Sequence, residues 1–186
     1  MAANEFDLIR IMVRYGARVM EVDHVNEEGK NVRVETTVME LVHHELDKDE
    51  LNFTTPLYNR IYQLLSEGLA QNELYSPSYL KRLEDQEIVG FVSDLESRDL
   101  ELSAQWLNKY NIVTRSESDR LQELVLNTIY SFKGAKIEER ISDIRKQLEN
   151  AAELEEAELM DLLAEQMAYE RIKIVLADKL GRIILR

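Results

Sequence analysis

The sequence predicts an all-α chain in which a helical bundle is followed by a long helix and a C-terminal antiparallel helical hairpin. Glycine and proline are scarce, at six and two of 186 residues, which disfavours sandwiches and barrels. Apolar residues recur at steps of three and four through 121–148 and again through 154–180, and no proline interrupts either run. Two such stripes joined by a short connection usually bury each other, so we expect them to form the hairpin.

The first element expected is a helix that begins at Asn4, a residue suited to capping, and ends near Met20. Alternating valines then flank a Gly-containing stretch, so 21–35 is expected to form a small hairpin or an ordered loop. Thr36 or Thr37 should cap the next helix, which ends near Asp47.

Two threonine- or serine-proline pairs mark the following helices. Thr55–Pro56 predicts a helix that fades near Gln71, and Ser76–Pro77 predicts a shorter one. A third apolar group, 88–95, marks another helix. The stretch 99–114 is less regular, and its Trp106 and Tyr110 are expected to cover the core.

The long helix should start at Ser116, where Asp119 approximates a capping box. Gly134 interrupts its apolar stripe and is a candidate hinge, because glycine weakens a helix by about 1 kcal/mol relative to alanine. We therefore expect a bundle subdomain over 1–132 and a hairpin subdomain over 133–186. Gly181 follows the last apolar residue of the second run and is expected to cap that helix.

Charge argues against a broad nucleic-acid surface. The formal net charge is −13, from 23 basic and 36 acidic residues, and phosphate backbones attract the opposite sign. Within the last helix the acids gather at the start and the bases at the end, which complements the helix dipole. The basic, aliphatic end could in addition be a contact surface.

The chain contains no cysteine and no apolar run long enough to span a bilayer, and its start lacks the basic flank and apolar core of a signal peptide. These features exclude disulfides and thiolate-ligated metals, and they favour a cytoplasmic protein that is not bound to a membrane.

Few patterns indicate catalysis. Glu21-x-x-His24 and Glu40-x-x-His43, with His44 beside it, resemble the motifs of a di-metal bundle, but such a site needs four helices that project inward. No glycine-rich phosphate loop or nucleophile elbow is present. Tyr58 and Tyr62, four residues apart, more simply pack against the core. We expect no catalytic residues, no metal and no cofactor.

Three stretches carry a family resemblance. They are DLIRIMVRYG (7–16), ELNF (50–53) followed by PLY (56–58), and IKIVLADKLGRIIL (172–185). In order and spacing they resemble the C-terminal, helicase-binding domain of the bacterial replicative DNA primase. The residues 21–35 exceed what compact members of that family carry, and the family's zinc module and polymerase core have no counterpart here. The resemblance therefore implies a bacterial domain excised from a longer primase.

The resemblance also implies a partner and a role. In that family the terminal hairpin docks on the N-terminal domains of the replicative DNA helicase, and the bundle modulates helicase activity. The chain would then be an interaction domain without catalytic activity of its own and without strong nucleic-acid binding. Two alternatives remain: a helical adaptor or oligomerisation module that self-associates through the hairpin, and a metal-dependent helical enzyme.

The docking residues are expected at the end of the last helix, where two apolar lines run side by side. A single antiparallel neighbour can cover only one such line, so the surplus should be exposed and rimmed by basic residues. The second line could instead close onto the bundle or pair with another copy. The expected helicase-binding residues are Ile172, Lys173, Ile174, Leu176, Ala177, Leu180, Arg182, Ile183, Ile184 and Leu185.

Overall fold

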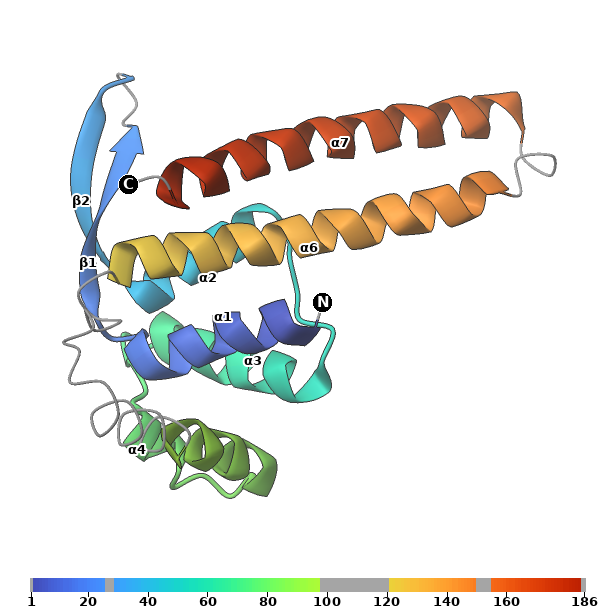
Figure 1. Cartoon of the computed structure of the whole chain (residues 1–186). Coiled ribbons are helices and arrows are strands. Elements are labelled where there is room, and N and C mark those ends of the chain that lie inside the picture. The colour runs from blue at the N-terminus through green and yellow to red at the C-terminus, as the bar shows by residue number, and fades with distance from the viewer. Residues whose placement is uncertain (1, 26–28, 98–120, 150–154, 185–186) are drawn as a thin grey trace, which may run out of the picture. The chain divides into compact units, whose positions relative to one another are not determined.

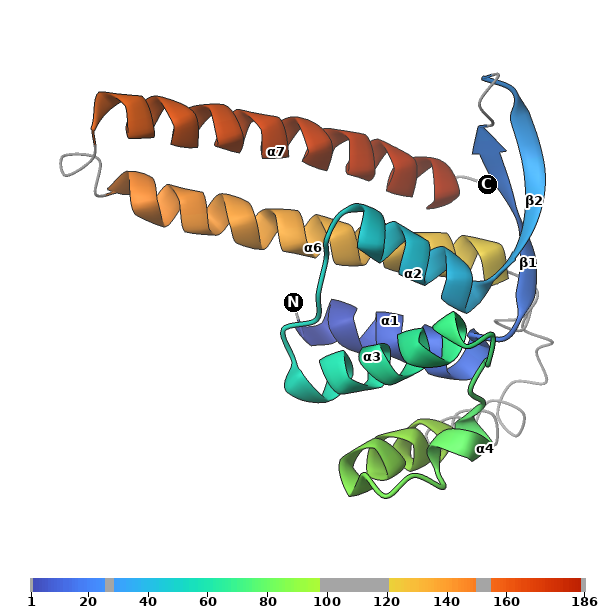
Figure 2. The same cartoon turned by 180° about the vertical axis from the view of Figure 1, so that it is seen from behind.

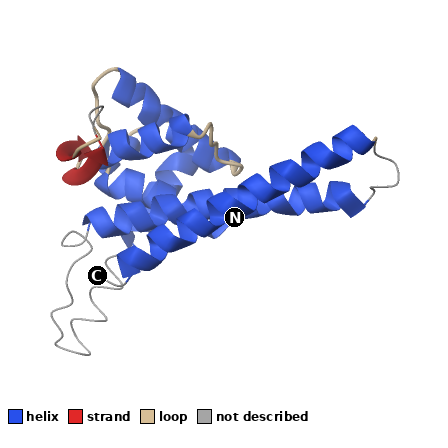
Figure 3. Cartoon of the chain, turned by 90° about the horizontal axis from the view of Figure 1, so that it is seen from above, coloured by secondary structure: helices blue, strands red, loops and turns tan. Residues whose placement is uncertain are grey.

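A computed structural model describes residues 2–25, 29–97, 121–149 and 155–184 (Figure 1). Over these residues the chain is mostly helical, with one pair of strands (Figure 3). The elements are α1 (Ala2–Tyr15), β1 (Val19–Val25), β2 (Asn31–Thr37), α2 (Val38–Lys48), α3 (Pro56–Ala70), α4 (Pro77–Leu80), an unlabelled helix over 86–97, α6 (Leu121–Glu149) and α7 (Glu156–Ile184). The all-α prediction thus holds for most of the chain, and the β-hairpin is the exception.

The described chain separates into two compact units. One is Glu5–Val125, and the other is Leu126–Arg186 together with Met1–Asn4. The boundary expected at 132/133 falls within α6, which runs through Gly134 without a break. The expected start of this helix at Ser116, and the expected roles of Trp106 and Tyr110, lie outside the described residues.

The first helix differs from its prediction at both ends. It begins at Ala2, so Asn4 lies inside the helix and does not cap it. It ends at Tyr15 rather than near Met20, because the next residues are drawn into the strand pair: Met20 pairs with Thr36. A Cβ at Gly16 would lie 2.4 Å from the Met12 carbonyl oxygen, so only glycine fits where the chain leaves the helix.

The β-hairpin is antiparallel, with Val22 opposite Val34 and Asp23 opposite Arg33. It satisfies the expectation of a hairpin at 21–35, and Figure 2 shows it as a separate ribbon leading into α2. Its base is fixed to the start of α2 by two backbone hydrogen bonds, in which Val38 N–H donates to Arg18 and Met39 N–H donates to Gly16. Arg33 Nη1 also lies 3.6 Å from Oε2 of Glu21, which is its diagonal neighbour on the paired strand.

The next two helices start where the sequence predicts. Thr37 caps α2 in a full capping box with Glu40, and α3 starts at Pro56 after Thr55. The helix over 86–97 is capped by Asp85, whose carboxylate accepts the backbone N–H groups of Glu87 and Ile88 at 3.0 and 3.3 Å.

The core of the Glu5–Val125 unit centres on α1, which buries apolar side chains on most of its circumference. Within this unit α3 lies beside α1, as Figure 1 shows. The buried side chains of this core include Leu8, Ile9, Ile11, Met12, Val13, Met20, Val38, Met39, Val42, Leu46, Phe53, Ile61, Tyr62, Leu65, Leu80, Ile88, Val92 and Leu95.

The second unit is the predicted hairpin of α6 and α7, which run antiparallel beside each other in all views (Figures 1 to 3). The prediction that Gly181 caps the last helix is wrong. The helix continues through it to Ile184, and among the described glycines only Gly29 has the positive φ that such a cap requires. Glycine permits that backbone conformation but does not impose it.

Candidate protein-docking surface on the C-terminal helix

One face of α7 is closed by α6. Leu162 and Leu176 are buried there, and Leu159, Tyr169 and Leu180 are half-buried. On the facing side, Ile141 and Ile144 of α6 are buried as well. The α7 residues are separated by three, seven, seven and four positions, all of them spacings that return to the same face of a helix.

Charged side chains link the two helices along this face. Arg140 donates through Nε and Nη2 to Glu165 Oε1 at 3.0 and 2.8 Å, and Arg145 donates to Glu170 at 2.9 Å. Lys173 Nζ lies 3.1 Å from Glu138. Each exposed pair contributes about 0–1 kcal/mol, so the set fixes alignment more than stability.

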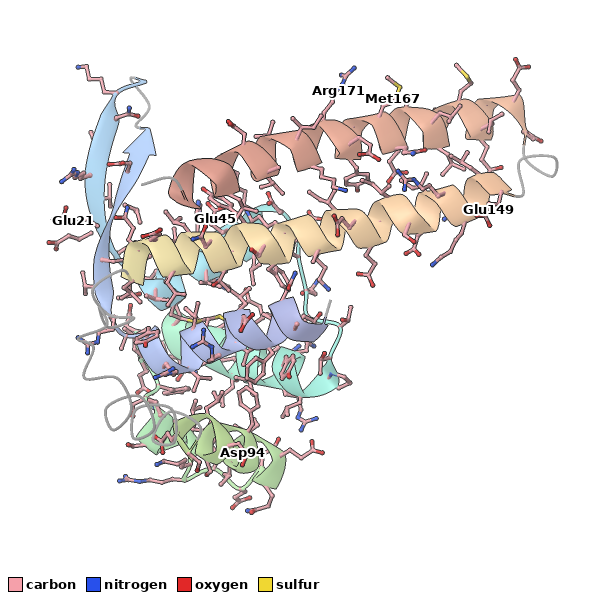
Figure 4. All side chains as sticks on the ribbon, viewed as in Figure 1. Glu21, Glu45, Asp94, Glu149, Met167 and Arg171 are labelled. Atoms are coloured by element: carbon pink, nitrogen blue, oxygen red, sulfur yellow. The ribbon has the colours of Figure 1, made fainter. Side chains whose placement is uncertain are left out.

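The opposite face of α7 is apolar and uncovered. Its large exposed side chains are Met160, Leu163, Met167, Ile172, Ile174 and Val175. A shallow hollow of about 450 Å³ lies on this face, lined by Leu163, Gln166, Met167, Glu170, Arg171 and Ile174. In Figure 4 the labelled Met167 and Arg171 project from α7 on the side away from α6. Exposed apolar patches of this kind mark contact surfaces for other molecules.

The predicted docking residues divide between the two faces. Ile172, Ile174 and Ala177 are exposed, and Ile174 is 69% accessible. Leu176, at 8%, and the half-buried Leu180 belong to the hairpin's own core.

The lysines expected to rim the exposed patch face α6 instead. Lys173 is half-buried and paired with Glu138, and Lys179 Nζ lies 5.1 Å from the ring centre of Tyr130, so both cations face α6. Arg182, Ile183 and Ile184 continue the helical backbone, and Leu185 lies outside the described residues.

The sequence analysis did not predict four of the exposed residues as docking residues. They are Val175 and, further from the helix end, Met160, Leu163 and Met167. Their signal was present, because they recur at helical spacing on the side opposite Leu162 and Leu176.

The two Glu-x-x-His motifs lie on different kinds of element. Glu21 and His24 belong to β1, whereas Glu40 and His43 belong to α2. Hydrogen bonds from the backbone and side chain of Thr37, at 2.7 and 2.8 Å, lower the pKa of the Glu40 carboxyl. These bonds commit Glu40 to helix capping.

His43 Nδ1 lies 2.9 Å from the hydroxyl of Tyr62, and burial raises the pKa of that tyrosine. Tyr62 also packs against Phe53, with ring centres 5.3 Å apart, as expected of a core residue. Among the described residues no group of three or more His, Cys, Asp or Glu side chains is placed to hold a metal.

The sequence analysis also did not predict a buried carboxylate, that of Glu5. Glu5 of α1 is 0% exposed, and it accepts four hydrogen bonds from the backbone and hydroxyl groups of Thr54 and Thr55, at 2.6–3.0 Å. Burial by itself would raise its pKa, but these bonds outweigh burial and lower the pKa of the Glu5 carboxyl from 4.5 to about 2. Glu5 thus caps α3 from a distant part of the sequence, and its donors show that the role is structural.

A cavity of about 300 Å³ in the same unit is lined by Phe6, Tyr58, Phe91, Asp94 and Leu95. The aromatic rings of this lining pack at an angle. The ring centre of Phe91 lies 5.9 Å from that of Phe6 and 5.6 Å from that of Tyr58. Figure 4 labels Asp94, the only carboxylate among the described residues of this lining. One exposed acid among aromatic rings provides no pair of groups for acid–base chemistry.

A known domain family matches residues 1–184, almost the whole chain. The chain belongs to the domain-of-unknown-function family DUF8430. No curated protein and no solved structure matches it. Membership of DUF8430 assigns no activity to the chain. No helix in the described part of this DUF8430 chain is both long and apolar enough to cross a membrane.

Proposed function

We propose that this chain is a protein-docking domain that attaches a primase to the N-terminal domains of the replicative DNA helicase. The observation that carries the proposal is the uncovered aliphatic end of α7. Ile172, Ile174 and Val175 are 46%, 69% and 55% exposed, although the inner face of the same helix is already closed by Leu176. Three large aliphatic side chains left in water within one turn of a helix gain no burial free energy on folding, whereas covering them favours association.

The choice of partner rests on the sequence resemblance to the helicase-binding domain of bacterial primase. The expected docking segment of that family corresponds to 172–185, the stretch in which these exposed residues lie. A helix that presents exposed β-branched residues within one turn is suited to a groove or to another helix. We assign the chain no catalytic role, and it would act by holding a separate catalytic body near the helicase.

Calorimetric titration of the chain with the N-terminal domains of the helicase tests the proposal. Ile174→Asp should weaken binding at least about tenfold, because it places a charge where an aliphatic side chain is buried on docking. Met160→Asp is the matched control: Met160 is 63% exposed on the same helix but lies away from its end.

The outcomes separate clearly. If the wild-type chain does not bind the helicase, the assigned partner is wrong. If Met160→Asp weakens binding as much as Ile174→Asp, the docking surface is not the end of α7.

A further inference from the structure

The distal part of the exposed face carries a pattern that the proposed docking of the helix end does not use. Leu163 and Ala164 are adjacent, and Met160 and Met167 lie three positions further out on either side. Glu156 and Arg171 lie four positions beyond the two methionines. We call these six residues the palindromic stripe, because their spacing is the same from either end: Met160 mirrors Met167, the larger Leu163 mirrors the smaller Ala164, and an acid at one end mirrors a base at the other.

The spacing places the palindromic stripe on one face of α7, because steps of three and four positions return to the same side of a helix. All six residues are exposed, including Met160 at 63% and Met167 at 58%. Figure 4 shows Met167 and Arg171 on the outer side of α7. The two long methionines flank a small residue, Ala164, which permits close approach of a second helix.

We propose that two copies of this chain pair through the palindromic stripe as an antiparallel, two-fold symmetric helix pair. A two-fold axis between Leu163 and Ala164 brings each residue opposite its mirror position in the pattern. Met160 then meets Met167 of the second copy, and Glu156 meets Arg171 of the second copy. Each contact occurs twice, so one ion pair closes each end of an apolar centre.

Charge complementarity selects a second copy over an unrelated occupant. The acid and the base of the stripe lie at its opposite ends, Glu156 at one and Arg171 at the other. Antiparallel pairing therefore sets each beside the opposite charge of the second copy, whereas parallel pairing would set Glu156 against Glu156 and Arg171 against Arg171. Neither Glu156 nor Arg171 forms an ion pair with another described residue, so both can pair with a second chain.

The size of the contact determines its strength. Fifteen steps separate the two ends of the palindromic stripe, about 22 Å of helix at 1.5 Å per residue. A contact of this length is small among specific interfaces, so we expect a reversible dimer with a dissociation constant of about 10–100 µM.

Sedimentation equilibrium of the intact chain over about 5–300 µM, which brackets the expected dissociation constant, tests the pairing. The variants exchange the charges at the two ends of the stripe. Glu156→Arg or Arg171→Glu alone places like charges at both ends and should raise the dissociation constant about tenfold. The combined Glu156→Arg/Arg171→Glu chain restores both pairs and should return to within about threefold of the wild type. Glu158→Arg is the matched control, since Glu158 lies in the same first turn of α7 but outside the stripe.

Cross-linking tests the register. The sequence has no cysteine, so one introduced thiol reports a single position. Ala164→Cys lies next to the two-fold axis and should form an interchain disulfide readily on oxidation. Ile174→Cys is the control, since in this register the two copies of residue 174 lie about 30 Å apart along the helices.

Several results would overturn the proposal. They are a monomer at every concentration, a double exchange no better than either single change, or equal cross-linking at positions 164 and 174. None of them bears on whether Ile174→Asp weakens helicase binding, so the two proposals stand or fall separately.

Discussion

Glu5→Gln should be the most destabilising conservative change in the α1–α3 region. The Glu5 carboxylate is fully buried and accepts the N–H and O–H groups of both Thr54 and Thr55. Glutamine presents one oxygen and one NH₂ group, so one threonine would face a donor in place of an acceptor. The backbone N–H of Thr55, at the start of α3, would lose a charged partner in the position that the helix dipole favours.

The lowered pKa of Glu5 gives the size of its contribution to the free energy of unfolding. A carboxyl whose pKa is 4.5 in the unfolded chain and about 2 in the folded one stabilises the fold by roughly 3 kcal/mol when ionised. Glutamine retains part of the hydrogen bonding, so we expect Glu5→Gln to lower the free energy of unfolding by about 2–3 kcal/mol at pH 7. Asp7→Asn is the control on the same helix. Asp7 is exposed and lies 3.8 Å from Arg10, so its replacement should cost about 0.5 kcal/mol or less.

The pH dependence has a definite sign. Because folding lowers the pKa of Glu5, its contribution is complete above pH 4.5 and is lost as the pH falls from 4.5 towards 2. Urea denaturation of wild type, Glu5→Gln and Asp7→Asn should therefore show a constant gap between wild type and Glu5→Gln from pH 6 to 8. The gap should shrink below pH 4.5. Equal effects of Glu5→Gln and Asp7→Asn at pH 7, or a gap that does not shrink in acid, would refute the argument.

Two further predictions concern the long helix and DNA. A Cβ at Gly134 would meet nothing within 4 Å, so Gly134→Ala should stabilise α6 by up to about 1 kcal/mol. If Gly134 is a hinge, amide hydrogen exchange across 130–140 should be faster than in the flanking turns, and it should slow in Gly134→Ala. Uniform protection across these residues in the wild type would exclude the hinge. The chain should also bind single-stranded DNA only weakly, because its net charge is −13. Fluorescence anisotropy that gave a submicromolar dissociation constant at physiological salt would contradict this.

Local signals in the sequence determined several elements of this protein directly. Thr37 with Glu40 and Thr55 with Pro56 mark helix starts because capping depends on residues only a few positions apart. The long stripes of α6 and α7 predicted the hairpin for the same reason, since helical periodicity is local. Glycine was a weak signal for the end of a helix, because Gly181 permits a C-cap but α7 continues through it.

Other features depended on which segments meet in space. The sequence predicted the start of α3 at Thr55–Pro56, but it gave no sign that the Thr55 hydroxyl bonds to Glu5, fifty positions away, and makes no capping bond to its own helix. The division of α7 into a buried and an exposed face was likewise decided by packing. Both faces are apolar, and contact with α6 covers Leu176 while leaving Ile174 and Met167 exposed. Hydrophobic periodicity gives the faces of a helix, whereas only the position of its neighbour decides which face is free to bind.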